Sequence, residues 1–265
     1  MKKSWSVIKS SYINALAFRS EIVLWLFLHV IPLVTIFAIW NSIYSNQNEI
    51  RGYSLTMILQ YYFMTSLIDS FTSTHFESWR VKEIREGKID FLLIRPLQYI
   101  QELFLRDIGG KALYLTLALP FFLVLFVIIS TQSGLTFPNA SIFQWSIFFG
   151  LLTVGYIVQF LAATIVVLSG FWLEYAEGGE HFKFVLLSLF GGWMIPIPMM
   201  PAWLQQIVNF LPLKYAFAKP IGIIQNTDKL AISDIVYIAA FVFFLWAIVQ
   251  ILWRKARYQY SSHGG

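Results

Sequence analysis

The chain has 265 residues, of which 58% are hydrophobic and only 12% are charged, and its formal net charge is +5. One soluble core cannot bury this much apolar surface, so hydrocarbon must be part of the protein's solvent. The chain contains no cysteine, which excludes disulfides, thiol catalysis and thiolate metal sites. No polar stretch is long enough for an appended soluble domain. We therefore expect a single all-α membrane domain over residues 1–265.

Residues 1–20 form the first predicted element. Trp5, Ile8, Tyr12 and Leu16 recur at helical spacing, whereas Lys9 falls elsewhere on the helical wheel. This pattern predicts an amphipathic helix that lies in the cytoplasmic membrane interface. The alternative is an ordinary positively charged flank of the first membrane span.

Six apolar stretches are candidates for membrane spans, since about 20 helical residues cross a hydrocarbon core of about 30 Å. They cover residues 22–44, 55–79, 112–130, 142–173, 184–198 and 232–253. The fifth is short, and we expect its helix to break near the outer face because of three prolines, Pro196, Pro198 and Pro201. Residues 199–231 then predict two short outer helices that partly re-enter the membrane.

The distribution of positive charge predicts the orientation of these spans. With the N-terminus inside, all but four of the 19 Lys and Arg residues lie on the cytoplasmic side, the exceptions being Arg51, Lys214, Lys219 and Lys229. The positive-inside rule favours this topology, which places both termini in the cytoplasm. The basic residues gather at the ends of apolar stretches, so a lipid bilayer explains them better than nucleic acid does.

The inside loop at residues 80–111 is the most charged part of the chain. It contains an apolar group, Ile89, Phe91, Leu92, Leu93 and Ile94, which is closed by Arg95 and Pro96. A short helix of this kind between two spans suits docking to a soluble partner at the membrane face. A helix packed beneath its own bundle explains the pattern equally well.

The string from Glu83 to Leu97 resembles the cytoplasmic loop of the permease subunits of bacterial ABC-2-type ABC transporters. The resemblance covers nearly the whole chain and extends to Phe171 to Glu177, to Pro196 to Gln205, to Asn209 to Pro212 and to the tail from Trp253 to Gly265. It implies a six-span half-transporter in the bacterial cytoplasmic membrane with an N-terminal interfacial helix, a coupling helix and short outer re-entrant helices. It also implies two ATPase subunits and a second permease half, which is either the same chain or a paralogue.

The resemblance further implies which residues contact the ATPase. Asp90, Phe91, Leu92 and Leu93 would sit in its groove, and the charged residues of the loop, Glu83, Arg85, Glu86, Lys88 and Arg95, would surround them, with ion pairs at the rim. The chain itself has no GxxxxGK[ST] phosphate loop, because Gly109-Gly110-Lys111-Ala112 lacks both the spacing and the hydroxyl. We therefore expect no enzyme activity and no cofactor on this chain, and ATP and magnesium on the partner.

Asp69 is the most notable ionisable residue inside a predicted span. Its helical neighbours Thr65, Ser66, Thr72 and Ser73 extend it into a polar stripe. Such a stripe should face the bundle interior or a wet cavity, because a carboxylate in lipid is costly. It is either part of a translocation path or a neutralised carboxyl that serves packing. No Lys or Arg inside the predicted spans is evident as its partner.

Glu174, Glu177 and Glu180 with His181 are the remaining candidates for a metal site. Gly178 and Gly179 interrupt their helical spacing, so a solvated charge cluster is the better interpretation and we expect no metal. No catalytic motif is present. The leading hypothesis is thus the permease of an ATP-driven exporter. The alternatives are an ion-coupled secondary transporter that uses Asp69, which the lack of inverted repeats disfavours, and a membrane scaffold without transport.

Overall fold

The computed structural model describes residues 2–88, 98–173, 175–176 and 178–259. The apolar group around Phe91 lies outside these residues. The described chain is mostly helical, and its α-helices are α1 Lys2–Leu16, α2 Arg19–Ile43, α3 Leu55–Thr72, α4 Glu77–Arg85, α6 Tyr99–Ser133, α7 Ile142–Ser169, α8 Gly178–Phe190, α9 Ala202–Phe210, α10 Ala218–Ile224 and α11 Ile232–Gln259. Short 3₁₀ helices are η1 Tyr44–Asn46, η2 Ile197–Met199 and η3 Pro212–Tyr215, and the strands are β1 Glu49–Ile50 and β2 Tyr53–Ser54.

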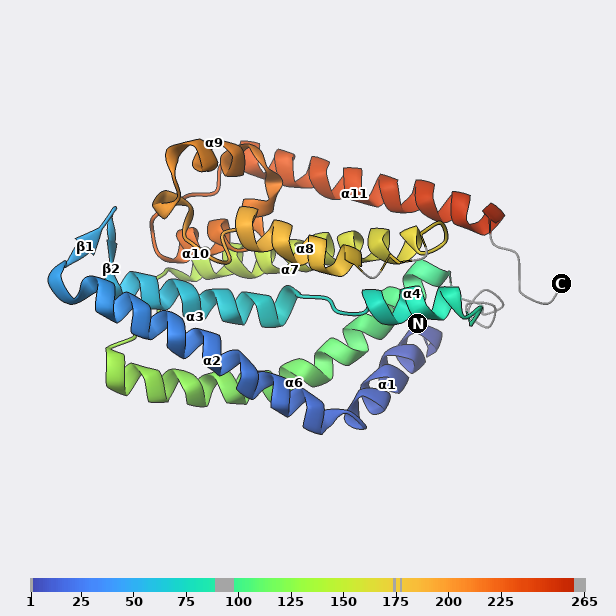
Figure 1. Cartoon of the computed structure of the whole chain (residues 1–265), viewed down its shortest axis with the longest axis horizontal. Coiled ribbons are helices and arrows are strands. Elements are labelled where there is room, and N and C mark those ends of the chain that lie inside the picture. The colour runs from blue at the N-terminus through green and yellow to red at the C-terminus, as the bar shows by residue number, and fades with distance from the viewer. Residues whose placement is uncertain (1, 89–97, 174, 177, 260–265) are drawn as a thin grey trace.

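The long helices run along the long axis of the molecule (Figure 1). The strands, α9 and α10 lie at one end, whereas α1, α4 and the C-terminal end of α11 lie at the opposite end. The segments that the sequence assigns to opposite sides of a membrane are therefore sorted to opposite ends of the structure.

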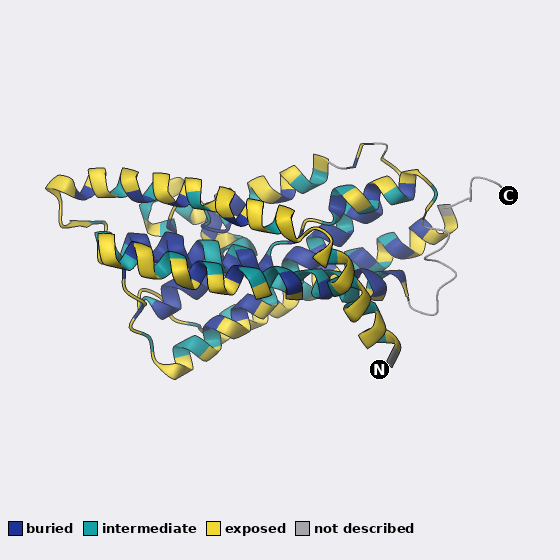
Figure 2. Cartoon of the chain, turned by 90° about the horizontal axis from the view of Figure 1, so that it is seen from below, coloured by how far each residue is buried: buried dark blue, intermediate teal, exposed yellow. Residues whose placement is uncertain are grey.

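Four helices of the described chain are long and apolar enough to cross a membrane, namely α2, α6, α7 and α11. In the most apolar 18-residue segment of each helix, 56% of the residues of α7 are buried, compared with 17% for α2 and for α11. Among these four helices α7 is therefore the central one. Figure 2 shows the corresponding pattern, with exposed residues along the outer faces of the long helices and buried residues toward the middle. These features support the expected all-α membrane fold.

The two larger of three apolar cores in the described chain join the long helices. The larger one surrounds α3, where Ile58, Leu59 and Ile68 are fully buried among residues of α2, α6, α7 and α10. The second lies toward the end that carries α4 and joins α4, α6, α7 and α11. In it Tyr99 and Trp253 stack with ring centroids 5.0 Å apart. Both ends of α7 are thus fixed by packing.

The second predicted stretch, 55–79, is not one continuous helix. α3 ends at Thr72, residues 73–76 are not helical, and α4 begins at Glu77. No proline marks this break. Side chains from other helices bind the backbone carbonyls of the broken segment, and sequence spacing does not reveal these contacts.

The fifth predicted stretch, 184–198, is also not helical throughout. α8 ends at Phe190, before the prolines that were expected to end it, because Gly192 adopts a left-handed conformation with φ of 86°. Two tyrosine hydroxyls of α3 bind the non-helical chain that follows: Tyr61 donates to the Gly192 carbonyl at 2.5 Å, and Tyr62 donates to the Met194 carbonyl at 2.8 Å. These bonds satisfy carbonyls that the helix no longer pairs.

The strands β1 and β2, which the sequence analysis did not predict, form a small antiparallel hairpin. Its two turn residues, Arg51 and Gly52, have φ of 49° and 82°, the combination that tight hairpins require. The Arg51 side chain donates to the carbonyls of Pro198 and Met200 at 3.1 and 2.9 Å. The hairpin therefore ties the loop after α2 to the loop after α8.

The helix α1 packs against the first part of α6. Ile8 and Tyr12 are half-buried in this contact, whereas Trp5 of the same predicted apolar stripe is 66% exposed. Ser11 Oγ donates to the Arg106 carbonyl at 2.7 Å. The two helices approach so closely at Gly109 that a Cβ there would lie 2.5 Å from the Ile8 carbonyl oxygen.

We predict that Gly109→Ala displaces α1 and lowers the free energy of unfolding by about 1–3 kcal/mol, the usual cost of overpacking. Gly110→Ala is the matched control, because nothing lies within 4 Å of a Cβ at the neighbouring position. It should be neutral or stabilising by up to ~1 kcal/mol, since alanine favours a helix over glycine. Thermal unfolding of the two purified variants checks this, and equal stability of both would contradict the packing described.

Candidate functional site

The described part of the predicted coupling loop consists of α4, the turn after it and the first part of α6. Glu83 and Arg85 lie on α4, and Glu86 and Lys88 lie in the turn. The other implied contact residues, Asp90, Phe91, Leu92, Leu93 and Arg95, lie outside the described residues. Of the charged residues implied to form ion pairs at the ATPase rim, Glu83, Arg85 and Glu86 are therefore among the described residues and Arg95 is not.

The described acids of this loop form ion pairs within the chain. Glu83 pairs with Arg80 one turn earlier, and Glu86 Oε2 lies 2.5 Å from Lys88 Nζ. The Lys88 side chain is 64% exposed and that of Glu86 is 35% exposed. The exposed Glu86–Lys88 pair contributes little to stability, so a partner can replace it at small cost.

The opposite face of α4 is firmly packed. Val81 is 1% exposed and lies against Gly170 at the end of α7, where a Cβ would be 3.3 Å from a Val81 methyl. Ile84 joins the second apolar core beside Tyr99 and Trp253. α4 therefore exposes Lys82 and Arg85 while its apolar face is fixed to the ends of α6, α7 and α11.

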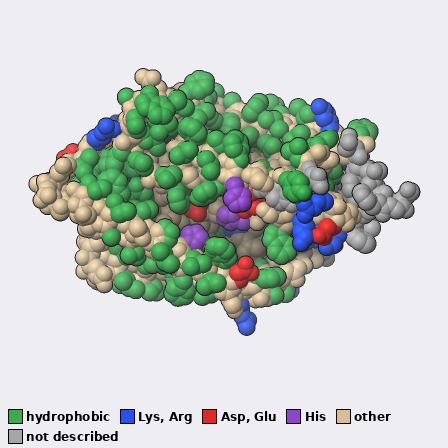
Figure 3. Space-filling view, viewed as in Figure 1, with side chains coloured by type: hydrophobic (Ala, Val, Ile, Leu, Met, Phe, Trp, Pro, Cys, Tyr) green, Lys and Arg blue, Asp and Glu red, His purple; other side chains and the backbone are tan. Residues whose placement is uncertain are grey.

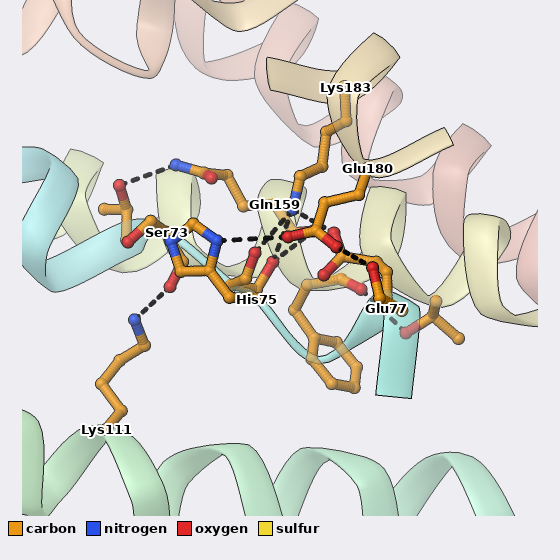
Figure 4. A network of polar contacts seen from close by, with 12 residues as sticks. Ser73, His75, Glu77, Lys111, Gln159, Glu180 and Lys183 are labelled. Atoms are coloured by element: carbon orange, nitrogen blue, oxygen red, sulfur yellow. Dashed lines mark hydrogen bonds and ion pairs between the residues drawn. The ribbon is translucent and has the colours of Figure 1, made fainter. Parts of the chain in front are cut away.

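The helix break at residues 73–76 is held by two lysines from other helices (Figure 4). Lys111 of α6 donates to the Ser73 carbonyl. Lys183 of α8 donates to the Thr74 carbonyl at 2.8 Å and to Thr74 Oγ1 at 3.0 Å. Carbonyls freed by a break need such partners away from water, so the break depends on α6 and α8.

Lys183 also forms a buried ion pair with Glu77, the first residue of α4. The Lys183 side chain is 9% exposed and that of Glu77 is fully buried. Glu77 Oε2 has no hydrogen-bond partner among the described residues. Because both charges are removed from water, either one left alone would be strongly unfavourable.

The central helix α7 joins this network through Gln159. Its side-chain amide donates to Thr72 Oγ1 at 2.8 Å, and its backbone carbonyl accepts from Thr74 Oγ1 at 3.4 Å. About one turn before Gln159 on α7, Tyr156 donates to Asp107 of α6 at 2.6 Å. Lys111 Nζ of α6 lies 5.4 Å from the Tyr156 ring centroid. The network thus connects α3, α4, α6, α7 and α8.

A second acid, Glu180, lies at the exposed edge of the network. Its carboxylate is 3.5 Å from His75 Nδ1 and accepts from Ser78 Oγ at 2.5 Å. Glu180, one of the residues considered for a metal site, is thus an ion-pair partner. Among the described residues no group of three His, Asp or Glu is arranged to hold a metal, and Glu174 and Glu177 lie outside them.

The polar stripe of α3 divides into two parts. Thr65 and Thr72 are buried, and their hydroxyls donate to carbonyls of their own helix at 2.8 and 2.9 Å. Ser66, Asp69 and Ser73 are half-buried on the neighbouring face. One edge of the stripe is therefore packed inside the bundle, and the other edge is partly exposed.

Asp69 is surrounded by cationic and titratable groups. His75, His29, Lys111 and Lys183 all lie within electrostatic range of its carboxylate. Figure 3 shows histidine and acidic side chains gathered at a hollow in the middle of a face that is otherwise largely apolar. Asp69 therefore lies in a polar environment within the bundle.

The sequence analysis missed the two lysines because it assigned Lys111 and Lys183 to cytoplasmic loops. Each directly precedes a predicted apolar stretch, at 112–130 and 184–198. A lysine at that position can turn back along its helix toward a polar group, which is the signal that was available.

The sequence model of the family described as "ABC-2 family transporter protein" matches residues 30–264. This match confirms the resemblance noted for the loop and the tail. No curated protein and no solved structure matches the chain.

We predict that Lys183→Met lowers the free energy of unfolding by about 3–5 kcal/mol, because it leaves the Glu77 charge buried without its partner. The double variant Lys183→Met/Glu77→Leu should be more stable than this single variant, since it removes both charges. Lys82→Met is the control, because this lysine of α4 is 62% exposed. Thermal unfolding of the three variants checks the order. A double variant less stable than Lys183→Met would contradict the role of the pair.

Proposed function

Because the chain belongs to the ABC-2 family of transporter proteins, we propose that it is a six-span permease half of an ATP-driven exporter. Family membership and the apolar helices indicate a multi-pass transmembrane subunit of an ABC transporter, and the family implies pairing with an ABC ATPase. The observation that carries the proposal is the position of α4. Lys82 and Arg85 of its last turn are exposed at the end of the bundle, whereas its first residue, Glu77, enters the buried network that holds α3, α6, α7 and α8 together.

Six spans follow if α3 and α8 cross the membrane beside the four longer helices. The 18 residues of α3 extend about 27 Å at 1.5 Å per residue, close to the thickness of a hydrocarbon core. The 13 residues of α8 are shorter, and the chain at 191–196 that α3 binds through Tyr61 and Tyr62 completes the crossing. We assign α9 and α10 to the outer region and expect α10, which is largely buried, to re-enter the membrane.

In the proposed mechanism, the segment that includes Asp90, Phe91, Leu92 and Leu93 occupies a groove of the ATPase. ATP and magnesium bind to two copies of that partner, and a second permease half, the same chain or a paralogue, completes the transporter. Closure of the ATPases on ATP draws the coupling segments together. α4 carries this movement to the break at residues 73–76, where Lys111 and Lys183 connect it to α6 and α8.

The half-buried edge of the polar stripe is the proposed translocation path. Ser66, Asp69 and Ser73 lie on it, and histidines and lysines lie within electrostatic range of Asp69. Thr65 and Thr72 support it from the packed side. We place the chain in the bacterial cytoplasmic membrane with both termini and α4 on the cytoplasmic side. Family membership favours this function over an ion-coupled transporter or a scaffold without transport.

We predict that Phe91→Asp prevents assembly with the ATPase, because a carboxylate cannot be desolvated in an apolar groove without a partner. Co-purification of the partner ATPase from the native membrane measures assembly. Phe210→Asp makes the same change at a 77% exposed aromatic on the outer helix α9 and should leave assembly intact. Full co-purification with Phe91→Asp would remove the coupling assignment.

We predict that cysteines placed on the path react with a water-soluble thiol reagent, because a thiol must ionise in water to react. The chain has no cysteine of its own, so each introduced thiol is unique. Ser66→Cys and Ser73→Cys should be labelled at least tenfold faster than Val124→Cys, which is 60% exposed on an apolar face of α6. Equal rates at Ser66→Cys and Val124→Cys would mean that the stripe is not wet.

A further inference from the structure

An apolar cavity of about 200 Å³ lies between α3, α6 and α7. On α3 it is lined by Phe63, Leu67 and Phe71, which follow one another at four-residue spacing. Asp69 is two positions after Leu67, about 200° around the helix at 100° per residue. The cavity and the polar stripe therefore occupy opposite faces of α3.

The lining of this cavity is rich in aromatic rings, including Phe122 of α6 and Phe148 of α7, and the indole of Trp145 is its one polar group among the described residues. Water is disfavoured there because it needs two to four polar partners. A smaller apolar cavity, of about 150 Å³, is already large enough to bind benzene. The cavity is thus suited to hydrocarbon, and leaving it empty would forfeit the dispersion contacts of its walls.

The mouth of the cavity opens on the outer surface of the bundle. Leu119, Leu123 and Phe149 line it and are 43%, 61% and 55% exposed. They belong to α6 and α7, which are both long and apolar enough to span the membrane. The mouth is therefore continuous with the surface that faces the bilayer, and hydrocarbon is the medium from which an occupant enters.

We propose that this cavity is a binding site for one acyl chain of a membrane lipid. The chain enters between α6 and α7 past Leu123 and reaches the buried rings of Phe63 and Phe148, which are 2% and 4% exposed. There it packs against the face of α3 that lies opposite Asp69. This inference does not depend on the proposed function, because it requires only that the helices stand in a bilayer.

The test uses the full chain in nanodiscs made with a phospholipid that carries a diazirine in the middle of one acyl chain. After irradiation, peptide mass spectrometry measures labelling of Phe63 and Phe148 relative to Val127, which is 59% exposed on the surface of α6. The proposal predicts clear labelling of both buried rings, since a chain bound in the cavity reaches them. Labelling confined to exposed residues such as Val127 would overturn it.

A matched pair of variants tests the route. Leu123→Trp should fill the mouth and lower labelling of Phe63 and Phe148 at least fivefold. Val124→Trp places the same ring at the next position, which is 60% exposed and does not line the cavity, and should change nothing. Leu119→Trp repeats the block one turn away if Leu123→Trp folds poorly. Unchanged labelling in a folded mouth variant would refute lipid binding.

Discussion

The constraint on which the structure depends is that a broken helix inside the bundle must find partners for its freed carbonyls. The break at residues 73–76 meets this requirement with two lysines from distant parts of the chain, Lys111 and Lys183. Lys183 brings its own charge into a buried site, and Glu77 balances it. Each of these groups is unfavourable without the others, so α4 can be attached to α3 only in the presence of α6 and α8. This interdependence holds α4 against α3, α6 and α8.

α3 separates two environments that differ in polarity. One face carries Asp69, which lies within electrostatic range of histidines and lysines, and the other borders a largely apolar cavity. The central helix α7 contacts both regions, through Gln159 at the network and Phe148 at the cavity. A displacement of α4 would therefore move α3, which has the polar path on one face and the apolar cavity on the other. In our proposal this arrangement links the ATPase to the translocation path.

Sequence patterns predicted those parts of the fold that depend on long apolar runs. α2, α6, α7 and α11 lie where such runs were found, because length and composition suffice to identify them. The ends of α3 and α8 were misplaced, since one depends on side chains from other helices and the other on the backbone conformation of Gly192. The hairpin was missed because its strands are too short to show alternation. Of the candidate site, the α3 stripe was recognised from helical spacing, but its lysine neighbours meet it only through tertiary packing.

The central claim is that the charged loop after α4 faces the compartment that holds the ATPase. Since the chain has no cysteine, one introduced thiol reports the side on which it lies. Lys88→Cys and Lys229→Cys place thiols at exposed positions on the two predicted sides. With a membrane-impermeant maleimide, the account predicts labelling of Lys229→Cys in intact spheroplasts and of Lys88→Cys only after the membrane is permeabilised. Labelling of Lys88→Cys from outside intact spheroplasts would contradict the orientation and the mechanism built on it.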